Sequence, residues 1–251
     1  VLSISNSGLL NTVKFKNSTA KYNLVIISTG YNSNLIKEAF NEKVVKNSYG
    51  ESAFTTILEH TKFKNNTARQ IFLDDSIFAL LPISNNRTSI VWSAKSIMKK
   101  SQKTFLKKKI QFYTSNFLKN IKFRNEIECK DLNFLIRSKY YLNRTLLFGD
   151  ALHVMHPFIG QGFNMTLRDL SCLEKILNQK INLGLDIGSA DVLSEFSQEI
   201  KPRNFIFSTG SDLLKRSISF KKARNKVFKT LNKSNFIKNI AFDIADKGFR
   251  F

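Results

Sequence analysis

The sequence contains few cysteines, few acidic residues and no long apolar run. Two cysteines, Cys129 and Cys172, occur in 251 residues and lack Cys-x-x-Cys spacing, which favours a reduced, cytosolic compartment over a disulfide-rich secreted fold. No apolar stretch approaches the roughly 20 residues that cross a bilayer. Hydrophobic residues still make up 42% of the chain, as expected for a globular protein with a sizeable core.

Acidic residues are outnumbered, because 19 Asp and Glu stand against 40 Lys and Arg and leave a net charge of +21. Such an excess can indicate nucleic-acid binding. Here the lysines are spread along the chain beside abundant Asn, Ile and Phe, a bias typical of an AT-rich genome, so we expect no nucleic-acid partner. Denser clusters lie at 98–109 and 215–224. We interpret them as solvated helix faces, and contact with an anionic membrane surface is the alternative.

Apolar periodicity predicts strands in the first part of the chain and helices in the last. Strands are expected at 1–5, 12–16, 23–27, 52–58, 68–73, 77–81, 88–93, 134–137 and 145–148, with a helical stretch near 96–122. One helix should run from Gly162 to about Asn178. A second should begin after an N-cap at Ser189, and Pro202 should kink or break it. The predicted fold class is α+β, with a mixed sheet, an antiparallel sheet and C-terminal helices.

The segment after the expected strand 144–148 has the chemistry of a ligand site. Gly149 and Asp150 follow the strand, and the loop then passes Pro157 and Gly160 before the helix at Gly162. Glycines let the backbone approach a ligand closely, and amides at a helix start attract negative charge. A carboxylate at the carboxyl end of a strand can accept hydrogen bonds from sugar-type hydroxyls. Ligands of open α/β sheets bind just outside these strand ends.

The run from Gly149-Asp150-Ala-Leu-His153 through Pro157 to Gly160-Gln161-Gly162-Phe163-Asn164 resembles the second FAD-binding motif of flavoprotein aromatic hydroxylases. The residues of the motif resemble most those of the ubiquinone-biosynthesis hydroxylases that are similar to 2-octaprenyl-6-methoxyphenol hydroxylase. The resemblance implies that Asp150 meets the ribityl chain of FAD and that the loop and helix amides face the isoalloxazine ring. It implies cofactor contacts by Asp150, Pro157, Gly160, Gln161, Gly162, Phe163 and Asn164, and by Gly30 in a second turn.

The same resemblance implies an FAD/NAD(P)-binding aromatic-hydroxylase fold that lacks its first Rossmann βαβ unit. We expect a remnant of the FAD-binding domain at 1–40, a substrate-binding β-sheet domain at 41–140, the second FAD motif and its helix at 141–180, and a C-terminal helical segment at 181–251. No Gly-x-Gly-x-x-Gly turn is present, and the chain opens at Val1 within a strand-like alternation. We therefore expect further residues upstream.

The implied activity is hydroxylation of a polyprenyl phenol in ubiquinone biosynthesis, with NAD(P)H and O2 as co-substrates, through a flavin C4a-hydroperoxide. No catalytic side chain is required. We expect a cytoplasmic protein, with peripheral attachment to the inner membrane through the basic C-terminal helices at 215–229 and contact with other ubiquinone-biosynthesis proteins as further possibilities. Thr29 and Ile36 depart from the family, which has Asp and Arg at these places. An alternative is therefore an incomplete or decayed non-catalytic copy that needs a separate FAD-domain segment, and another is a basic nucleic-acid- or membrane-binding module.

Some single residues have simpler interpretations. His153 and His156 lie three residues apart, but no carboxylate or cysteine stands at ligand spacing, so we predict a structural hydrogen bond for His153 and no metal. Asp169 is expected in an ion pair or a backbone contact. Trp92 is expected in the core, and His60 at the surface near a strand end.

Overall fold

The computed structural model describes residues 1–40, 44–157, 160 and 162–218, and it divides into two compact units. The first unit comprises Val1–Asn47 and Asn133–Phe251, and the second comprises Ser48–Leu132. The domain functions expected for the four sequence segments stay predictions.

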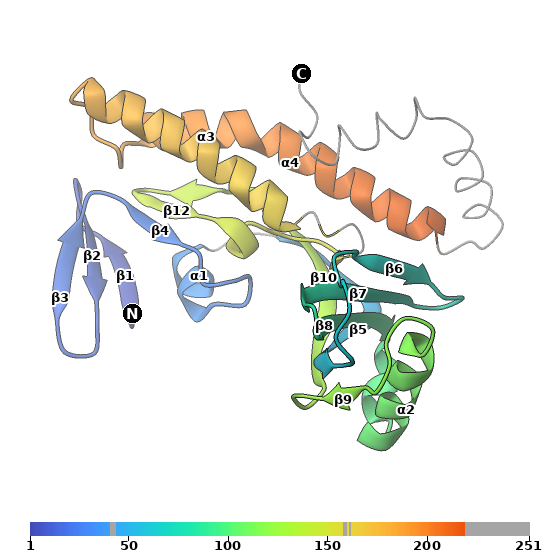
Figure 1. Ribbon diagram of the computed structural model, residues 1–251. Helices are drawn as coiled ribbons and strands as arrows, with labels where there is room; N and C mark the ends of the chain where they lie inside the picture. Colours follow the sequence, from blue (N-terminus) through green and yellow to red (C-terminus); the bar gives the residue numbers. More distant parts are fainter. Residues whose placement is uncertain (41–43, 158–159, 161, 219–251) are drawn as a thin grey trace. The chain divides into compact units, whose positions relative to one another are not determined.

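The first unit is organised around a small mixed sheet. Its strands are β4 (Val25–Ile27), β11 (Tyr141–Leu142) and β12 (Thr145–Leu147), in the order β11-β12-β4. Strands β12 and β4 are parallel although 120 residues separate them, with Leu147 opposite Ile27. Helix α1 (Asn34–Ala39) lies on one face of this sheet, and α3 (Gly162–Asn182) and α4 (Ala190–Ile218) lie side by side on the other (Figure 1). All three residues of β12 are buried, which explains why 145–147 is almost wholly apolar rather than alternating, whereas Ile26 of β4 is 43% exposed.

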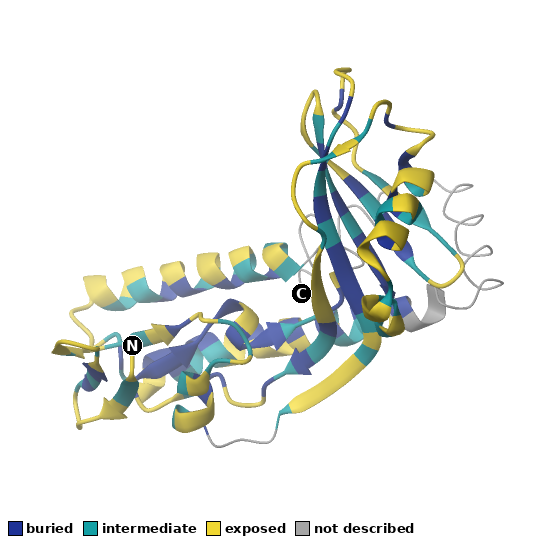
Figure 2. Ribbon diagram, turned by 90° about the horizontal axis from the view of Figure 1, so that it is seen from below, coloured by how far each residue is buried: buried dark blue, intermediate teal, exposed yellow. Residues whose placement is uncertain are grey.

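One hydrophobic core joins these three layers. Ile27, Leu146 and Leu147 of the sheet pack with residues of all three helices, among them Ile36, Leu173, Ile176, Phe196 and Ile200. In Figure 2, buried segments in dark blue recur along the helical part of this unit. The core therefore holds the ends of β4 and β12 in fixed positions.

A three-stranded antiparallel meander precedes this sheet. It contains β1 (Ser3–Asn6), β2 (Asn11–Lys14) and β3 (Thr19–Tyr22), and the third strand was not predicted. The buried Asn11 side chain donates from Nδ2 to the Arg144 carbonyl and to the Thr145 hydroxyl, each over 2.8 Å. These bonds attach the meander to the start of β12.

Helix α4 continues through Pro202, so of the expected kink or break the break does not occur. A proline within a helix leaves the carbonyl four residues earlier without its amide partner. Here that carbonyl belongs to Gln198, an exposed residue, so water can hydrate it. Packing of Val192, Leu193, Phe196 and Ile200 into the core supports the helix before Pro202, and the buried Asn204 supports it afterwards. Helix α3 also runs four residues further than expected, to Asn182.

The second unit is an antiparallel sheet with one helix, as the strand pattern predicted. Its sheet order is β10-β5-β8-β7-β6, with β9 paired to β5. The strands are β5 (Val45–Glu59), β6 (Arg69–Phe72), β7 (Ile77–Ser84), β8 (Arg87–Lys95), β9 (Lys122–Phe123) and β10 (Glu128–Ile136). A 3₁₀ turn, η1 (Ser96–Lys100), and helix α2 (Lys103–Thr114) replace the longer helix expected near 96–122. The helix ends at Thr114, whose hydroxyl donates to the Ile110 carbonyl, and the chain later turns through Asn120, at φ 53°, into β9.

An aromatic row forms the core of the second unit. Phe54 and Phe78 stand opposite Trp92 on neighbouring strands, with ring centroids 5.5 and 6.3 Å away, and Tyr113 of α2 completes the group at 5.8 Å from Trp92. Trp92 is 2% exposed, which confirms its assignment to the core.

The two basic clusters differ in their surroundings. In the first, Lys99 pairs with Asp131 and Lys103 pairs with Glu126, on exposed side chains, as a solvated face requires. In the second, Lys215 is only 8% exposed, so its interpretation as part of a solvated face was wrong. Residues 221–224 lie outside the described residues. No helix among the described residues has both the length and the apolar character that a membrane span demands.

Candidate functional site

Two glycine-containing turns lie next to each other at the carboxyl ends of β4 and β12. The Phe148 amide donates to the Ile27 carbonyl over 2.9 Å, so the two strands stay paired up to their ends. Gly30 follows β4 with φ 83°, and Gly149 follows β12 with φ 60°. The turn around Gly30 and the turn around Gly149, far apart in sequence, therefore share the sheet edge at which ligands of parallel sheets bind.

Gly149 is favoured by its backbone conformation. Its positive φ is strained for residues with a Cβ atom. A Cβ added there would lie 3.5 Å from Thr166 Cγ2, on the second turn of α3. The Gly149 turn is therefore held close to the beginning of α3.

Asp150 follows in a short 3₁₀ turn, η2 (Gly149–Ala151), and is exposed. Its carboxylate makes no hydrogen bond within the part of the chain that the structure describes. The neighbouring Gly149 and Ala151 are buried, so the backbone is fixed while the carboxylate remains accessible. Asp150 can therefore accept hydrogen bonds from the hydroxyls of a ligand.

The loop toward α3 presents its predicted site residues to solvent. Pro157 and Gly160 are exposed, and the Gly160 amide donates to the Pro157 carbonyl over 2.9 Å in a turn with φ 69° at the glycine. Gln161 lies outside the described residues. Helix α3 starts at Gly162, and Phe163 is 71% exposed while Asn164 is half-buried.

No acidic side chain stands in the first turn of α3. The partial positive charge of its N-terminal amides is therefore not neutralised from within that turn, and it is suited to a ligand that carries or develops negative charge.

Arg137 links the two turns, and sequence reasoning did not identify it. Its side chain is buried and donates from Nε to the Ala151 carbonyl over 2.7 Å and from Nη2 to the Tyr31 carbonyl over 3.3 Å. The backbone amide of Arg137 donates to the Leu152 carbonyl over 3.2 Å. An Arg at the end of an apolar strand carried no signal, because its partners come from two distant segments.

A buried polar network lies directly behind the Asp150 turn. His153, in the short strand β13 (His153–Val154), contacts Asp169 Oδ2 from Nε2 over 3.0 Å, and Asn204 Nδ2 donates to the same oxygen over 2.9 Å. Burial, with a smaller contribution from the Asp169 charge, raises the pKa of Tyr140 to about 12, although a hydrogen bond with Asn204 opposes the shift. The structural hydrogen bond expected for His153 is therefore made with Asp169. His156 is buried as well.

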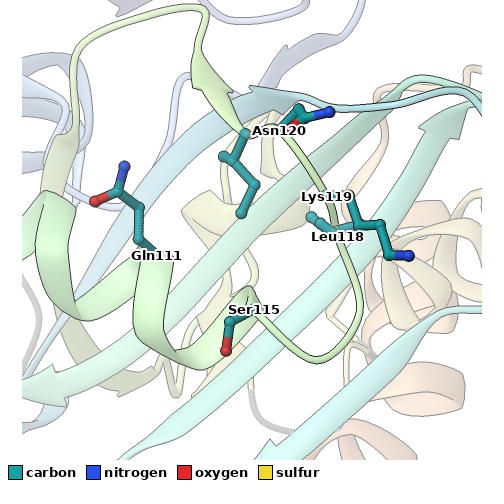
Figure 3. A pocket seen from close by; sticks show the side chains of 6 residues that line it. Gln111, Ser115, Leu118, Lys119 and Asn120 are labelled. Carbon is teal, nitrogen blue, oxygen red and sulfur yellow. The ribbon is translucent and has the colours of Figure 1, made fainter.

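These residues fit the ribityl and isoalloxazine end of a flavin. An accessible carboxylate, two glycine turns with positive φ and an open helix N-terminus converge on one edge, as a polyhydroxylated, electron-accepting ligand requires. By contrast, the hollow of about 460 Å³ beside α2 is lined by Gln111, Ser115, Leu118, Lys119, Asn120 and Ile121 (Figure 3). It is open and contains none of the predicted site residues.

Comparison with known proteins gives a consistent assignment. The sequence profile of the squalene epoxidase family matches residues 21–237. The ubiquinone biosynthesis monooxygenase COQ6 of Dictyostelium discoideum is 28% identical over 218 residues, which cover 71% of this chain and 44% of that protein. The ubiquinone hydroxylase UbiL of Rhodospirillum rubrum is 30% identical over 173 residues, which cover 67% of this chain and 40% of that protein.

Solved structures share the fold. HpxO of Klebsiella pneumoniae, in complex with FAD and uric acid, superposes with a TM-score of 0.74 at 16% identity, covering 97% of this chain and 64% of that one. PqsL of Pseudomonas aeruginosa, in complex with 2-aminobenzoylacetate, gives a TM-score of 0.72 at 16% identity, covering 90% and 66%. The chain thus spans less than half the length of these curated relatives and about two thirds of these structures. The aromatic-hydroxylase fold predicted from the sequence is confirmed, and the chain belongs to the squalene epoxidase family of FAD-dependent monooxygenases.

Proposed function

We propose that this chain forms the flavin-facing and substrate-facing part of an FAD-dependent monooxygenase that hydroxylates a polyprenyl phenol in ubiquinone biosynthesis. The observation that carries the proposal is the pairing of β4 with β12. It brings the Gly30 turn, the Gly149 turn and Asp150 to one edge, beside the start of α3. The names of the COQ6 and UbiL relatives support the substrate class.

Each site residue has a defined task in this proposal. Asp150 accepts hydrogen bonds from the ribityl hydroxyls, and the amides at Gly162, Phe163 and Asn164 face the pyrimidine edge of the flavin. Gly30 and Gly160 have no side chain, so the backbone can approach the cofactor closely, and Pro157 and Gln161 complete the loop. Bound FAD supplies the redox and oxygen chemistry, and the protein orients it and excludes water.

The co-substrates follow from this chemistry. NAD(P)H is proposed as the reductant and O2 as the oxygen donor, with the sheet of the second unit as the substrate-binding surface. A polyprenyl phenol resides in a membrane, so we also propose peripheral attachment through exposed lysines of the 98–109 cluster, such as Lys100 and Lys108. Co-sedimentation with anionic liposomes at low salt tests this attachment, and a protein that stays in solution under those conditions contradicts it.

Flavin binding by the purified chain is the decisive experiment. We expect FAD to be retained or to be bound on titration, with a visible flavin absorbance band and quenched flavin fluorescence. Asp150→Asn should weaken binding at least about tenfold, because one charge-assisted hydrogen bond contributes roughly 1.5–3 kcal/mol. Asp75→Asn, at an exposed carboxylate of the second unit, is the matched control and should bind as the unchanged chain does. Absence of any flavin binding contradicts the proposal.

A non-catalytic copy is the second candidate, and Ile36 favours it. This residue stands where the family has Arg, and it is 1% exposed within the apolar core. The chain therefore offers no cation at that position, and Thr29 offers no carboxylate. A chain that binds no flavin, alone or with an added Gly-x-Gly-x-x-Gly segment, would support this candidate.

A further inference from the structure

Four polar side chains from four separate segments meet inside the core of the first unit. They are Tyr140, His153, Asp169 on α3 and Asn204 on α4, and each is at most 4% exposed. Leu152, Leu173 and Ile200, which neighbour them in sequence or along the helices, belong to the apolar core. An ionised carboxylate in such surroundings is costly unless hydrogen-bond donors surround it.

The geometry fixes which atoms carry protons. An ionised carboxylate can only accept hydrogen bonds. His153 Nε2 and Asn204 Nδ2 both approach Asp169 Oδ2, over 3.0 and 2.9 Å, so both nitrogens donate to it. His153 therefore carries a hydrogen on Nε2.

His153 also belongs to the segment that carries Asp150. The two residues are three apart, and His153 pairs through its backbone with Ile136 of β10. Between them, Leu152 accepts a hydrogen bond from the Arg137 amide. The His153 imidazole thus connects the segment that carries Asp150 to α3 by its contact with Asp169. Because Asn204 of α4 donates to the same Asp169 oxygen, the segment is connected to α4 as well.

We propose that Asp169 and Asn204 are positioning residues for the flavin site. They hold His153 in its Nε2-protonated form and thereby fix residues 149–154, which present Asp150 to the cofactor. Helix α4, more than 50 residues after Asp150 at its Asn204 position, is through this contact a part of the cofactor site. The effect on the cofactor rests on the proposed function, whereas the proton position on His153 does not.

Nitrogen-15 labelling of histidine tests the proton position directly. The chain has only three histidines, so long-range proton–nitrogen NMR spectra are simple, and His153→Gln identifies the His153 signals. We expect a hydrogen on Nε2 in the unchanged chain and an altered protonation pattern in Asp169→Asn. Glu174→Gln, an exposed carboxylate-to-amide change on the same helix, should leave the pattern unchanged. A His153 that carries its only ring hydrogen on Nδ1, or that ignores Asp169→Asn, overturns the proposal.

Hydrogen–deuterium exchange tests the mechanical consequence in the full chain without flavin. In Asp169→Asn and in Asn204→Leu, peptides covering 148–157 should exchange about tenfold faster, since a loss near 1.4 kcal/mol of local stability gives that factor. Leu173→Ala on α3 controls for general destabilisation, and it should accelerate exchange throughout the unit without preference for 148–157. Uniform acceleration in all three variants contradicts positioning. Two network variants are used so that failure of one to fold still leaves a result.

Flavin titration completes the test. If the chain binds FAD, Asp169→Asn should weaken binding about tenfold at unchanged helix content, as expected for the loss of one correctly placed hydrogen-bonding group. Leu173→Ala should weaken it less. Equal weakening in both variants overturns the positioning role. If no variant and not even the unchanged chain binds flavin, the proposed function fails, while the NMR and exchange results still decide the proton position and the coupling.

Discussion

The Nε atom of Arg137 donates a hydrogen bond of 2.7 Å to the carbonyl oxygen of Ala151. The same guanidinium reaches the Tyr31 carbonyl, so one buried side chain connects the residue after Gly30 with the residue after Asp150. Strand pairing alone aligns β4 with β12 only up to Phe148. Beyond the strand ends, the hydrogen bonds of Arg137 hold the Gly30 turn and the Gly149 turn in position relative to each other.

Replacement of Arg137 should therefore damage both stability and cofactor binding. Arg137→Lys and Arg137→Met each remove the fork that serves two carbonyls, and a buried carbonyl without a partner costs about 1–3 kcal/mol. We expect urea unfolding to show a loss of about 2–4 kcal/mol for Arg137→Met, and a smaller loss for Arg137→Lys. Arg203→Lys, at an exposed surface pair on α4, is the control and should change the free energy of unfolding by less than about 0.5 kcal/mol. A neutral Arg137→Met would show that the turns do not need this bond.

A second prediction concerns the left-handed backbone at Gly149. Gly149→Ala should lower the free energy of unfolding by about 1–2 kcal/mol, because the residue has φ 60°, a conformation that strains a residue with a Cβ atom. The matched change is Gly210→Ala, in the interior of α4 with open space around it. It should raise stability by roughly 0.5–1 kcal/mol. Equal effects of the two substitutions in thermal unfolding would contradict this account.

The sequence predicted the local parts of the site better than the long-range ones. The strand, loop and helix from Thr145 to the end of α3 follow from apolar runs and glycines that act on their own neighbourhood. Arg137, Asn204 and His60 were missed or misplaced, because each depends on a partner distant in the chain. His60, expected at the surface, is 7% exposed and its Nε2 lies 2.9 Å from the Thr88 hydroxyl, on a strand 28 residues away.

The continuity of α4 at Pro202 has a related origin. Propensity rules describe a helix in water, where a lost backbone bond and a steric clash end it. In α4, buried side chains on both sides of Pro202 compensate for that loss. Tertiary packing of this kind cannot be seen in the periodicity of one segment.

Alkaline pH should destabilise the first unit through Tyr140. Its folded pKa of about 12 lies above the ordinary value of 10.0, so the folded state holds its proton longer than the unfolded state does. The resulting stabilisation is complete below about pH 10 and is lost as pH rises through about 12. At about pH 11 the unfolded state already gains roughly 1.4 kcal/mol relative to neutral pH from this group. Denaturant unfolding of Tyr140→Phe should lack this part of the alkaline decline, whereas Tyr22→Phe, at an exposed tyrosine, should retain it. Identical alkaline slopes in the two variants would contradict the assignment.

The largest loss of stability from one substitution is expected in the segment that connects α3 and α4. Arg144, at the start of β12, donates to the Asn23 carbonyl over 2.8 Å and pairs with Asp186, whose pKa it lowers by hydrogen bonding. Gly188 packs against this pair so tightly that an added Cβ would lie 1.8 Å from the Asn23 oxygen. That atom is backbone, so the overlap can be relieved only by moving the chain before β4. We expect Gly188→Ala to cost at least about 3 kcal/mol, at the upper end of overpacking substitutions. Gly184→Ala, also between the helices but at φ 68° in open space, should cost only about 1–2 kcal/mol. Thermal unfolding of the two variants separates steric overlap from backbone strain, and a Gly188→Ala variant as stable as Gly184→Ala would show that the helix connection yields without disturbing β4.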